Sequence, residues 1–271
     1  MRVPRRFAQV FPPPSELAWY AAIRILRHWA ARLPEGEMVR RSVRLAGSIA
    51  VLAGKSPAAF TAMGRGIAQT VFYRTHAMDV LSRLDGPSSR RWEGFRAEAA
   101  ASPRSIFVSA HLGPFQLQMD LLADLLCPIL ILYRAYTWPP LAVEMAELRK
   151  KTDRFTYVDI RRPREIVKAL RNGMSLGILG DVAPSPVPAR LAVRWGAPIF
   201  VGGLYNLGDP QETPPPGSAP PAPQVPASLT PAVFGFEYHR IDPSDEETTA
   251  RACALALDRT LRAHRSDWIH S

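Results

Sequence analysis

His111 lies where a short apolar run gives way to a Gly-Pro turn, a position at which an imidazole can act as an acid or a base. The stretch reads SAHLGPFQ over residues 109–116. Proline suits the first position of a helix, and glycine before it permits a tight turn. We expect the helix that follows to hold Gln116 in its first turn, facing His111. An imidazole whose tautomer is fixed by a partner is what acyl transfer to a hydroxyl or amine requires.

The partner that this spacing offers to the imidazole is a neutral amide. A charge-assisted hydrogen bond is roughly twice as strong as a neutral one, so Gln116 should give a weaker base than a carboxylate would. Asp120, one helical turn further on, is a candidate substitute acid, or else a solvated carboxylate on an amphipathic helix. His111 itself either contacts a reacting ligand or caps the turn as a structural histidine.

Three further charged residues follow predicted strands or lie on a predicted helix. Arg134 and Arg149 either bind an anion or form ordinary ion pairs with nearby acidic residues. Asp181 follows a glycine at a strand end, where it either contacts substrate or simply ends the strand. The two cysteines form no CxxC pair and no Cys/His cluster at metal spacing, so we expect no metal site and no disulfide framework.

Residues 105–240 alternate between short apolar runs and helix-forming stretches. We expect strands over residues 105–109, 128–133, 156–159, 175–179, 198–204 and 233–240. Expected helices cover residues 92–101, 115–126, 140–151, 163–172 and 245–264. Apolar strands separated by helices of about 10 to 15 residues are typical of an α/β fold, with a mostly parallel mixed sheet covered on both faces. Reactive groups gather at the carboxyl ends of such strands, where His111 and Asp181 both lie.

We divide the chain into a helical N-terminal extension, residues 1–69, and an α/β domain, residues 70–271. Within the extension, Gly64-Arg65-Gly66 predicts a break between helices. Within the domain, residues 208–231 hold too many prolines for a helix or a central strand, so we expect a flexible loop between two strands.

The extension should begin with an amphipathic helix from Ser15 to about residue 33. One face carries four apolar residues, and arginines crowd the other side; the apolar residues are Trp19, Ile23, Leu26 and Ala30. This helix either lies in a membrane interface or packs on the core. No apolar run there approaches the roughly 20 residues of a spanning helix, and no signal peptide is visible. We therefore expect a cytoplasmic protein, or one held peripherally on the inner face of the inner membrane.

The chain is basic, with 34 Lys and Arg against 24 Asp and Glu and a formal net charge of +10. Such a balance attracts any polyanion, whether nucleic acid, anionic membrane or an acidic protein. No stacking aromatics interleave with the basic runs as single-strand binders require, so we expect no nucleic-acid partner.

From about Thr70 onward the chain resembles the late lipid A acyltransferases, the lauroyl and myristoyl transferase family of the lysophospholipid acyltransferase group. That family has a His-x4-Glu or His-x4-Asp box after a strand, and AHLGPFQ at residues 110–116 is similar to it. Three further stretches match the family in order: ILYRAYTWPPLAVEMAELRKK at 131–151, ALRNGMSLGILGD at 169–181 and LDRTLRAHRSDWIHS at 257–271. They place Arg134, Arg149, Asp181, Trp268 and His270 on family positions.

The resemblance implies a lysophospholipid acyltransferase-like fold and an acyltransferase activity. The acyl group would pass from an acyl carrier protein or coenzyme A thioester to a hydroxyl or amine on a lipid, sugar or polyketide-type acceptor. His111 would be the general base, oriented by Gln116, while Arg134, Arg149 and Asp181 would bind substrate. No metal or other cofactor is implied.

Three departures leave a second interpretation open. Gln116 replaces the acidic residue of the box, VAPSPVP at residues 182–188 replaces an aromatic-glycine stretch, and the short basic helix replaces a spanning anchor. The alternative is a non-catalytic homologue that binds an acyl chain, a carrier protein or a membrane.

Overall fold

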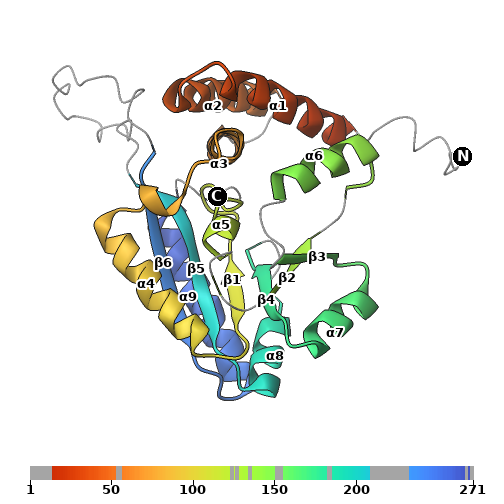
Figure 1. The fold of residues 1–271 in the computed structure, drawn as a ribbon, viewed down its shortest axis with the longest axis vertical. Helices are drawn as coiled ribbons and strands as arrows, with labels where there is room; N and C mark the ends of the chain where they lie inside the picture. Colours follow the sequence, from red (N-terminus) through yellow and green to blue (C-terminus); the bar gives the residue numbers. More distant parts are fainter. Residues whose placement is uncertain are drawn as a thin grey trace, which may run out of the picture.

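A six-stranded mixed sheet forms the centre of the computed structural model (Figure 1). The structure describes residues 14–52, 57–122, 125, 128–133, 136–149, 155–181, 185–207, 232–265 and 268. The strand order is β3-β2-β4-β1-β5-β6. The strands are β1 (Ile106–Ser109), β2 (Ile129–Tyr133), β3 (Phe155–Asp159), β4 (Ser175–Leu179), β5 (Ile199–Asn206) and β6 (Phe234–Ile241). All neighbours pair in parallel except β5 and β6, which are antiparallel. The predicted α/β class with a mostly parallel mixed sheet is confirmed.

One face of the sheet packs against an aromatic cluster on α4 (Gly86–Ala100). Trp92 and Phe95 of this helix lie against Phe107, Phe200 and Phe236 of the sheet. The helix begins at Gly86, six residues before the predicted start at Trp92. Asp85 accepts a hydrogen bond from the backbone N–H of Ser88 and so caps the first turn. A short helix, α5 (Gln118–Leu122), covers the same face.

The other face is covered by α7 (Pro163–Arg171), α8 (Val187–Trp195) and α9 (Glu246–Ala263). Leu170 of α7 and Ala192 of α8 pack on Ile106, Val108 and Leu130. Helix α8 is absent from the sequence-based expectation, because three prolines crowd its start. Proline is tolerated in the first turn of a helix, and Gly196 in the left-handed conformation (φ +61°) then ends it.

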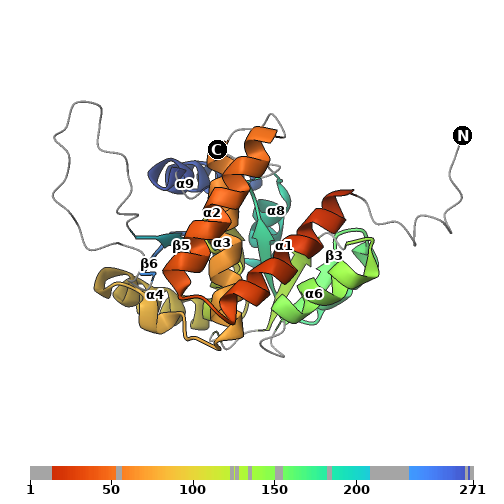
Figure 2. The same ribbon diagram turned by 90° about the horizontal axis from the view of Figure 1, so that it is seen from above.

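A helical layer stands over the carboxyl ends of the strands (Figures 1 and 2). It comprises α1 (Pro14–Ala30), α2 (Glu35–Leu52), α3 (Pro57–Thr75) and α6 (Pro139–Arg149). Ile23, Leu26 and Ala30 of α1 are buried against α3 and α6. The apolar face that the sequence offered to a membrane therefore packs on the core.

Helix α3 is continuous through Gly64 and Gly66, so the predicted break there is wrong. These glycines serve close packing: a Cβ on Gly64 would meet the Cβ of Ala46 at 2.8 Å, and one on Gly66 would meet the carbonyl oxygen of Gly113 at 2.4 Å. The boundary that we drew between residues 69 and 70 consequently falls inside α3.

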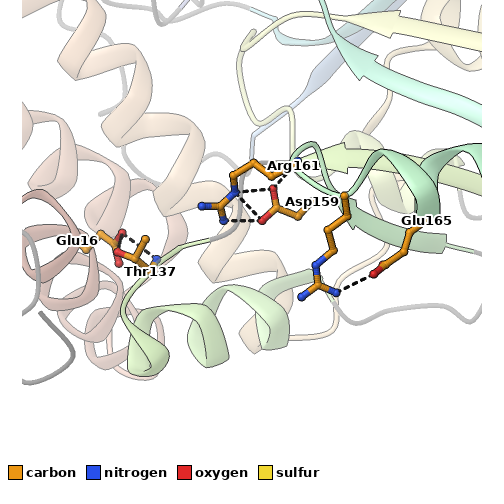
Figure 3. Close-up of polar contacts among 6 residues, drawn as sticks. Glu16, Thr137, Asp159, Arg161 and Glu165 are labelled. Atoms are coloured by element: carbon orange, nitrogen blue, oxygen red, sulfur yellow. Dashed lines mark hydrogen bonds and ion pairs between the residues drawn. The ribbon is translucent and has the colours of Figure 1, made fainter. Parts of the chain in front are cut away.

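Glu16 joins the first helix to the start of α6 (Figure 3). Its carboxylate accepts hydrogen bonds from the backbone N–H of Thr137 at 3.0 Å, from the Thr137 hydroxyl at 2.7 Å and from the backbone N–H of Trp138 at 2.7 Å. The contact fixes α1 to a segment more than a hundred residues away in the sequence.

Within the described ranges, no helix combines the length and the apolar character that crossing a bilayer demands. The proline-rich stretch 208–231 lies outside the described residues.

Candidate functional site

His111 and Asp181 lie side by side because they follow two neighbouring parallel strands. Ser109 at the end of β1 is paired with Leu179 at the end of β4, and each residue of interest comes two positions later. The backbone N–H of Gly180 donates to the carbonyl of Ser109 at 2.8 Å, so the pairing extends past both strand ends. The sheet thus brings together two side chains 70 residues apart in the sequence.

The carboxylate of Asp181 holds both the ring and the backbone of His111. Nδ1 of the imidazole lies 3.1 Å from Oδ1, and the backbone N–H of His111 donates to Oδ2 at 3.0 Å. The Asp181 side chain has no solvent exposure, whereas that of His111 is 25% exposed. The buried carboxylate therefore supports an imidazole that solvent and ligands can reach.

Trp268 also contacts the carboxylate of Asp181. Its indole N–H donates to Oδ2 of Asp181 at 2.9 Å, and its backbone forms a bridge with Leu112. Trp268 also packs against the small buried cluster of Ala110, Leu112 and Tyr205. The C-terminal end of the described chain is thereby fastened to the turn that carries His111.

Burial raises the pKa of Asp181, but hydrogen bonds from the His111 ring, from the Trp268 indole and from the His111 backbone outweigh that effect. The net pKa lies below the usual value of an aspartate. An ionised carboxylate accepts hydrogen bonds only, so Nδ1 of His111 carries the proton that faces it. Once Nδ1 faces the carboxylate, Nε2 is the ring nitrogen that can take a proton from a substrate.

The structure places Gln116 differently from the sequence-based expectation. The turn after His111 opens no helix at Pro114: Gly113 adopts a left-handed conformation (φ +49°), and α5 begins only at Gln118. The side chain at Nδ1 is Asp181, which the sequence assigned to substrate binding. Gln116 instead lines a cavity next to the imidazole.

This cavity of about 90 Å³ lies against the ends of β1, β2 and β4. Its lining is largely apolar, with Phe107, Met119, Leu122 and Ile131 among its walls. Phe115 belongs to the lining and also contacts the His111 ring, with ring centroids 4.8 Å apart and planes at 68°. The His111 ring is not part of the lining, and Phe115 connects it to the cavity.

Polar groups enter the cavity from several elements. Ser109 and Gln118 form a hydrogen bond with one another there, in which the serine hydroxyl donates to Oε1 of the glutamine at 2.9 Å. Arg74 of α3, with Tyr133 and Tyr157, completes the polar part of the wall. The sequence singled out none of these three as site residues, because it did not show where α3, β2 and β3 lie relative to one another.

The remaining predicted site residues are not tested by these contacts. Arg134 and His270 lie outside the described residues, and so do the side chains of Asp120 and Arg149, although both belong to helices. Among the described residues, no three His, Cys, Asp or Glu side chains gather as a metal ion would require.

The sequence indicated only in part that His111 pairs with Asp181. Both residues were placed at carboxyl ends of strands, but the order of strands in the sheet was not visible, so the sequence left them unpaired. Comparison of the chain with protein-family models finds no match, and comparison with the curated proteins finds none at a significant level.

Proposed function

We propose that the protein is an acyltransferase that moves an acyl group from a carrier-protein or coenzyme A thioester to a hydroxyl or amine. The observation that carries the proposal is the His111–Asp181 couple near a largely apolar cavity. His111 is the catalytic residue, and Asp181 positions it and stabilises the imidazolium.

The reaction needs one base that later acts as an acid. Nε2 of His111 takes the proton from the acceptor's O–H or N–H as that atom attacks the thioester carbonyl. The tetrahedral intermediate collapses with cleavage of the C–S bond, and the imidazolium returns the proton to the leaving thiolate. A new ester or amide and a free thiol result, and His111 regains its neutral form.

The cavity accounts for the acyl group, since its walls of Phe107, Met119, Leu122 and Ile131 suit an aliphatic chain. Gln116 lines the cavity and so contacts the substrate rather than the imidazole. Cys253 offers no competing nucleophile, because burial raises the pKa of its thiol to about 11.

A lysophospholipid acyltransferase-like arrangement is part of this proposal. It is supported by the position of His111 directly after the parallel strand β1 and by the match of Asp181 and Trp268 to family positions. In that arrangement Arg134 and Arg149 bind the phosphate or carrier-arm anion of the donor. The basic surface would speed association with an acidic carrier protein.

A non-catalytic acyl-binding protein is the second candidate, and Gln116 in place of an acid is the feature that favours it. Asp181 weakens the support for this candidate. Its carboxylate, which follows a neighbouring strand, faces Nδ1 of His111 and takes the place of the acid that residue 116 lacks.

The decisive experiment mixes the purified full chain with acyl-carrier or acyl-coenzyme A donors of graded length and with hydroxyl and amine acceptors. Release of free thiol and formation of acylated acceptor are both measured. His111→Ala should abolish acceptor acylation. The matched control is His264→Ala, which removes a second histidine–carboxylate pair, with Nε2 of His264 3.3 Å from Glu237, away from the cavity. Equal turnover in wild type and His111→Ala would refute the assignment, and donor binding without turnover would favour the second candidate.

A further inference from the structure

The outer side of α7 carries a row of positive charges. Three exposed basic residues follow one another at intervals of four and three positions, which places them on one side of the helix: Arg164, Lys168 and Arg171. Val167, which is 46% exposed, lies among them. Ala169 and Leu170 are buried on the opposite side, where the helix packs on the sheet. We call the four exposed residues the basic face of α7.

The acidic residues of the same segment are already paired with other arginines. Residues 155–173 hold five basic and two acidic side chains. Nε of Arg161 donates to both carboxylate oxygens of Asp159 at 3.0 Å (Figure 3), and Glu165 lies 3.1 Å from Arg162. The three cations of the basic face form no ion pair with any carboxylate that the structure describes. The basic face therefore offers three charges to an acidic partner.

The shape of the basic face suits a helix. A shallow hollow of about 450 Å³ runs along it, lined by Pro163 and Asn172 as well as by the four residues of the face. Arg164 and Arg171 are seven residues apart, which is about 10 Å along a helix axis. A partner helix that presents carboxylates over two turns would match this length, with an apolar side chain against Val167. In Figure 1 α7 lies at the edge of the molecule, where such a partner can approach it.

Helix α7 starts at the end of the sheet that carries the candidate site. It begins at Pro163, four residues after β3 ends at Asp159, and Tyr157 of β3 lines the cavity. Strand β3 is the outermost strand, and three strand spacings separate it from β1, about 14 Å in all. A partner on α7 would thus lie beside the site and leave it open. Only a group carried on an arm could reach from there to His111.

We propose that the basic face of α7 docks an acidic helix of the carrier protein that delivers the acyl group. This role of α7 rests on the proposed function, and it gives the place where the donor binds. Carboxylates of the partner pair with the three cations, and their attraction speeds the encounter. The arm of the carrier protein then spans the outer strands and brings the thioester to His111.

A bilayer is a poorer match to this surface than a protein helix. Insertion into the boundary between headgroups and acyl chains requires a broad apolar face. Among the residues that the structure describes in α7, only Val167 is a large apolar side chain exposed to solvent. The basic face therefore offers charge in a defined spacing and little apolar area.

The binding experiment uses the purified full chain and a purified acyl carrier protein that bears its pantetheine arm but no acyl group. Fluorescence anisotropy of the labelled carrier protein measures the dissociation constant at low and at moderate salt. We expect saturable binding that weakens as salt rises, because salt screens exposed charges. Since no acyl group is present, this measurement does not depend on turnover.

Charge reversal tests the basic face directly. The triple variant Arg164→Glu with Lys168→Glu and Arg171→Glu should weaken binding by at least about tenfold, because each attraction becomes a repulsion. Arg164→Lys with Arg171→Lys keeps the charge and should keep the binding. All three positions are exposed, so each variant should fold, and circular dichroism checks that it does.

The matched control makes the same change in net charge elsewhere. Arg44→Glu with Arg251→Glu and Arg259→Glu replaces three exposed arginines on α2 and α9. It should weaken binding far less than the triple variant of α7. Equal losses in the two would show general electrostatic attraction and overturn the proposal, and so would a lack of binding by the wild type. If the α7 variant lost binding to phosphatidylglycerol vesicles but kept the carrier protein, the face would belong to a membrane and the proposal would be wrong.

Turnover separates the docking from the chemistry. The triple variant of α7 should raise KM for the acyl-carrier donor by at least about tenfold. It should leave kcat/KM unchanged for acyl-pantetheine, a donor without the protein. Equal KM values for wild type and variant on the acyl-carrier donor would refute the docking face and keep the proposed function. Weakened binding in the variant, with no turnover by the wild type on any donor, would support the docking face and refute acyl transfer.

Discussion

The indole of Trp268 donates to the carboxylate of Asp181 at 2.9 Å, across 87 residues of sequence. The same oxygen accepts the backbone N–H of His111. Trp268 is therefore a positioning residue, which acts on the imidazole through the carboxylate that both contact.

Trp268→Phe should keep the aromatic packing and remove one donor from a buried carboxylate. We expect the free energy of unfolding to fall by about 1–3 kcal/mol, the cost of leaving a buried polar group short of a partner. Urea denaturation at neutral pH measures it. In an Asp181→Asn background the same substitution should cost much less, because the ionised acceptor is gone. Additive losses in the double variant would show that the indole stabilises the protein by packing alone.

The free energy of unfolding should depend on pH in a way that reflects the ionisation of Asp181. Its pKa is lowered in the folded protein, so its ionised form stabilises the fold above the unfolded-state value of about 3.9, and this contribution disappears as pH falls through the lower folded-state value. Urea denaturation from neutral pH into the acid range should therefore show Asp181→Asn losing less stability than the wild type. Parallel curves for the two proteins would contradict this account.

Gly66 and Gly47 offer a matched pair of glycine substitutions. A Cβ on Gly66 would meet the carbonyl oxygen of Gly113 at 2.4 Å, so Gly66→Ala must push α3 away from the His111 turn and should destabilise by about 1–3 kcal/mol. A Cβ on Gly47 would meet only Thr61 Cγ2 at 3.5 Å, an ordinary contact. Gly47→Ala should stabilise by roughly 0.5–1 kcal/mol through helix propensity. Thermal denaturation of both variants checks the difference in sign.

Kinetics should separate the roles of Asp181 and Gln116. Asp181→Asn should lower kcat by up to about four orders of magnitude, as replacing the acid of a similar histidine–aspartate couple by its amide does. Gln116→Ala should act mainly on KM for the acyl donor, because Gln116 lines the cavity rather than touching the ring. Gln116→Glu should fail to raise kcat, since Nδ1 already faces a carboxylate. An increase in kcat with Gln116→Glu would return the orienting role to residue 116.

The strands could be predicted closely because most of them are continuous apolar runs. The run at residues 175–179 coincides with β4, and the other predicted strands differ from the observed ones by one or two residues at one or both ends. Parallel strands buried on both faces leave this pattern in the sequence without help from tertiary contacts.

The partner of His111 could not be predicted in this way. Strands β1 and β4 are neighbours in the sheet, although β2 and β3 come between them in the chain. The local spacing favoured Gln116, five residues on, but the left-handed Gly113 delays the helix and carries Gln116 away from that role. The side chain that replaces it comes from the adjacent strand, which only the strand order could reveal.

What the first helix packs against could not be predicted from the sequence, for a similar reason. Its apolar face is visible in the sequence, but what covers that face depends on α3 and α6, which pack against Ile23 and Leu26.

The antiparallel edge of the sheet has a practical consequence. Asn206 of β5 is opposite Phe234 of β6, and the backbone N–H of Leu207 donates to the carbonyl of Val233 at 3.0 Å. The chain thus leaves the sheet and rejoins it at points one hydrogen bond apart, so the length of what connects them does not affect strand alignment. A fluorescent reporter spliced in between these points, or a connection shortened to a tight hairpin, should leave the pairing of β5 with β6 intact.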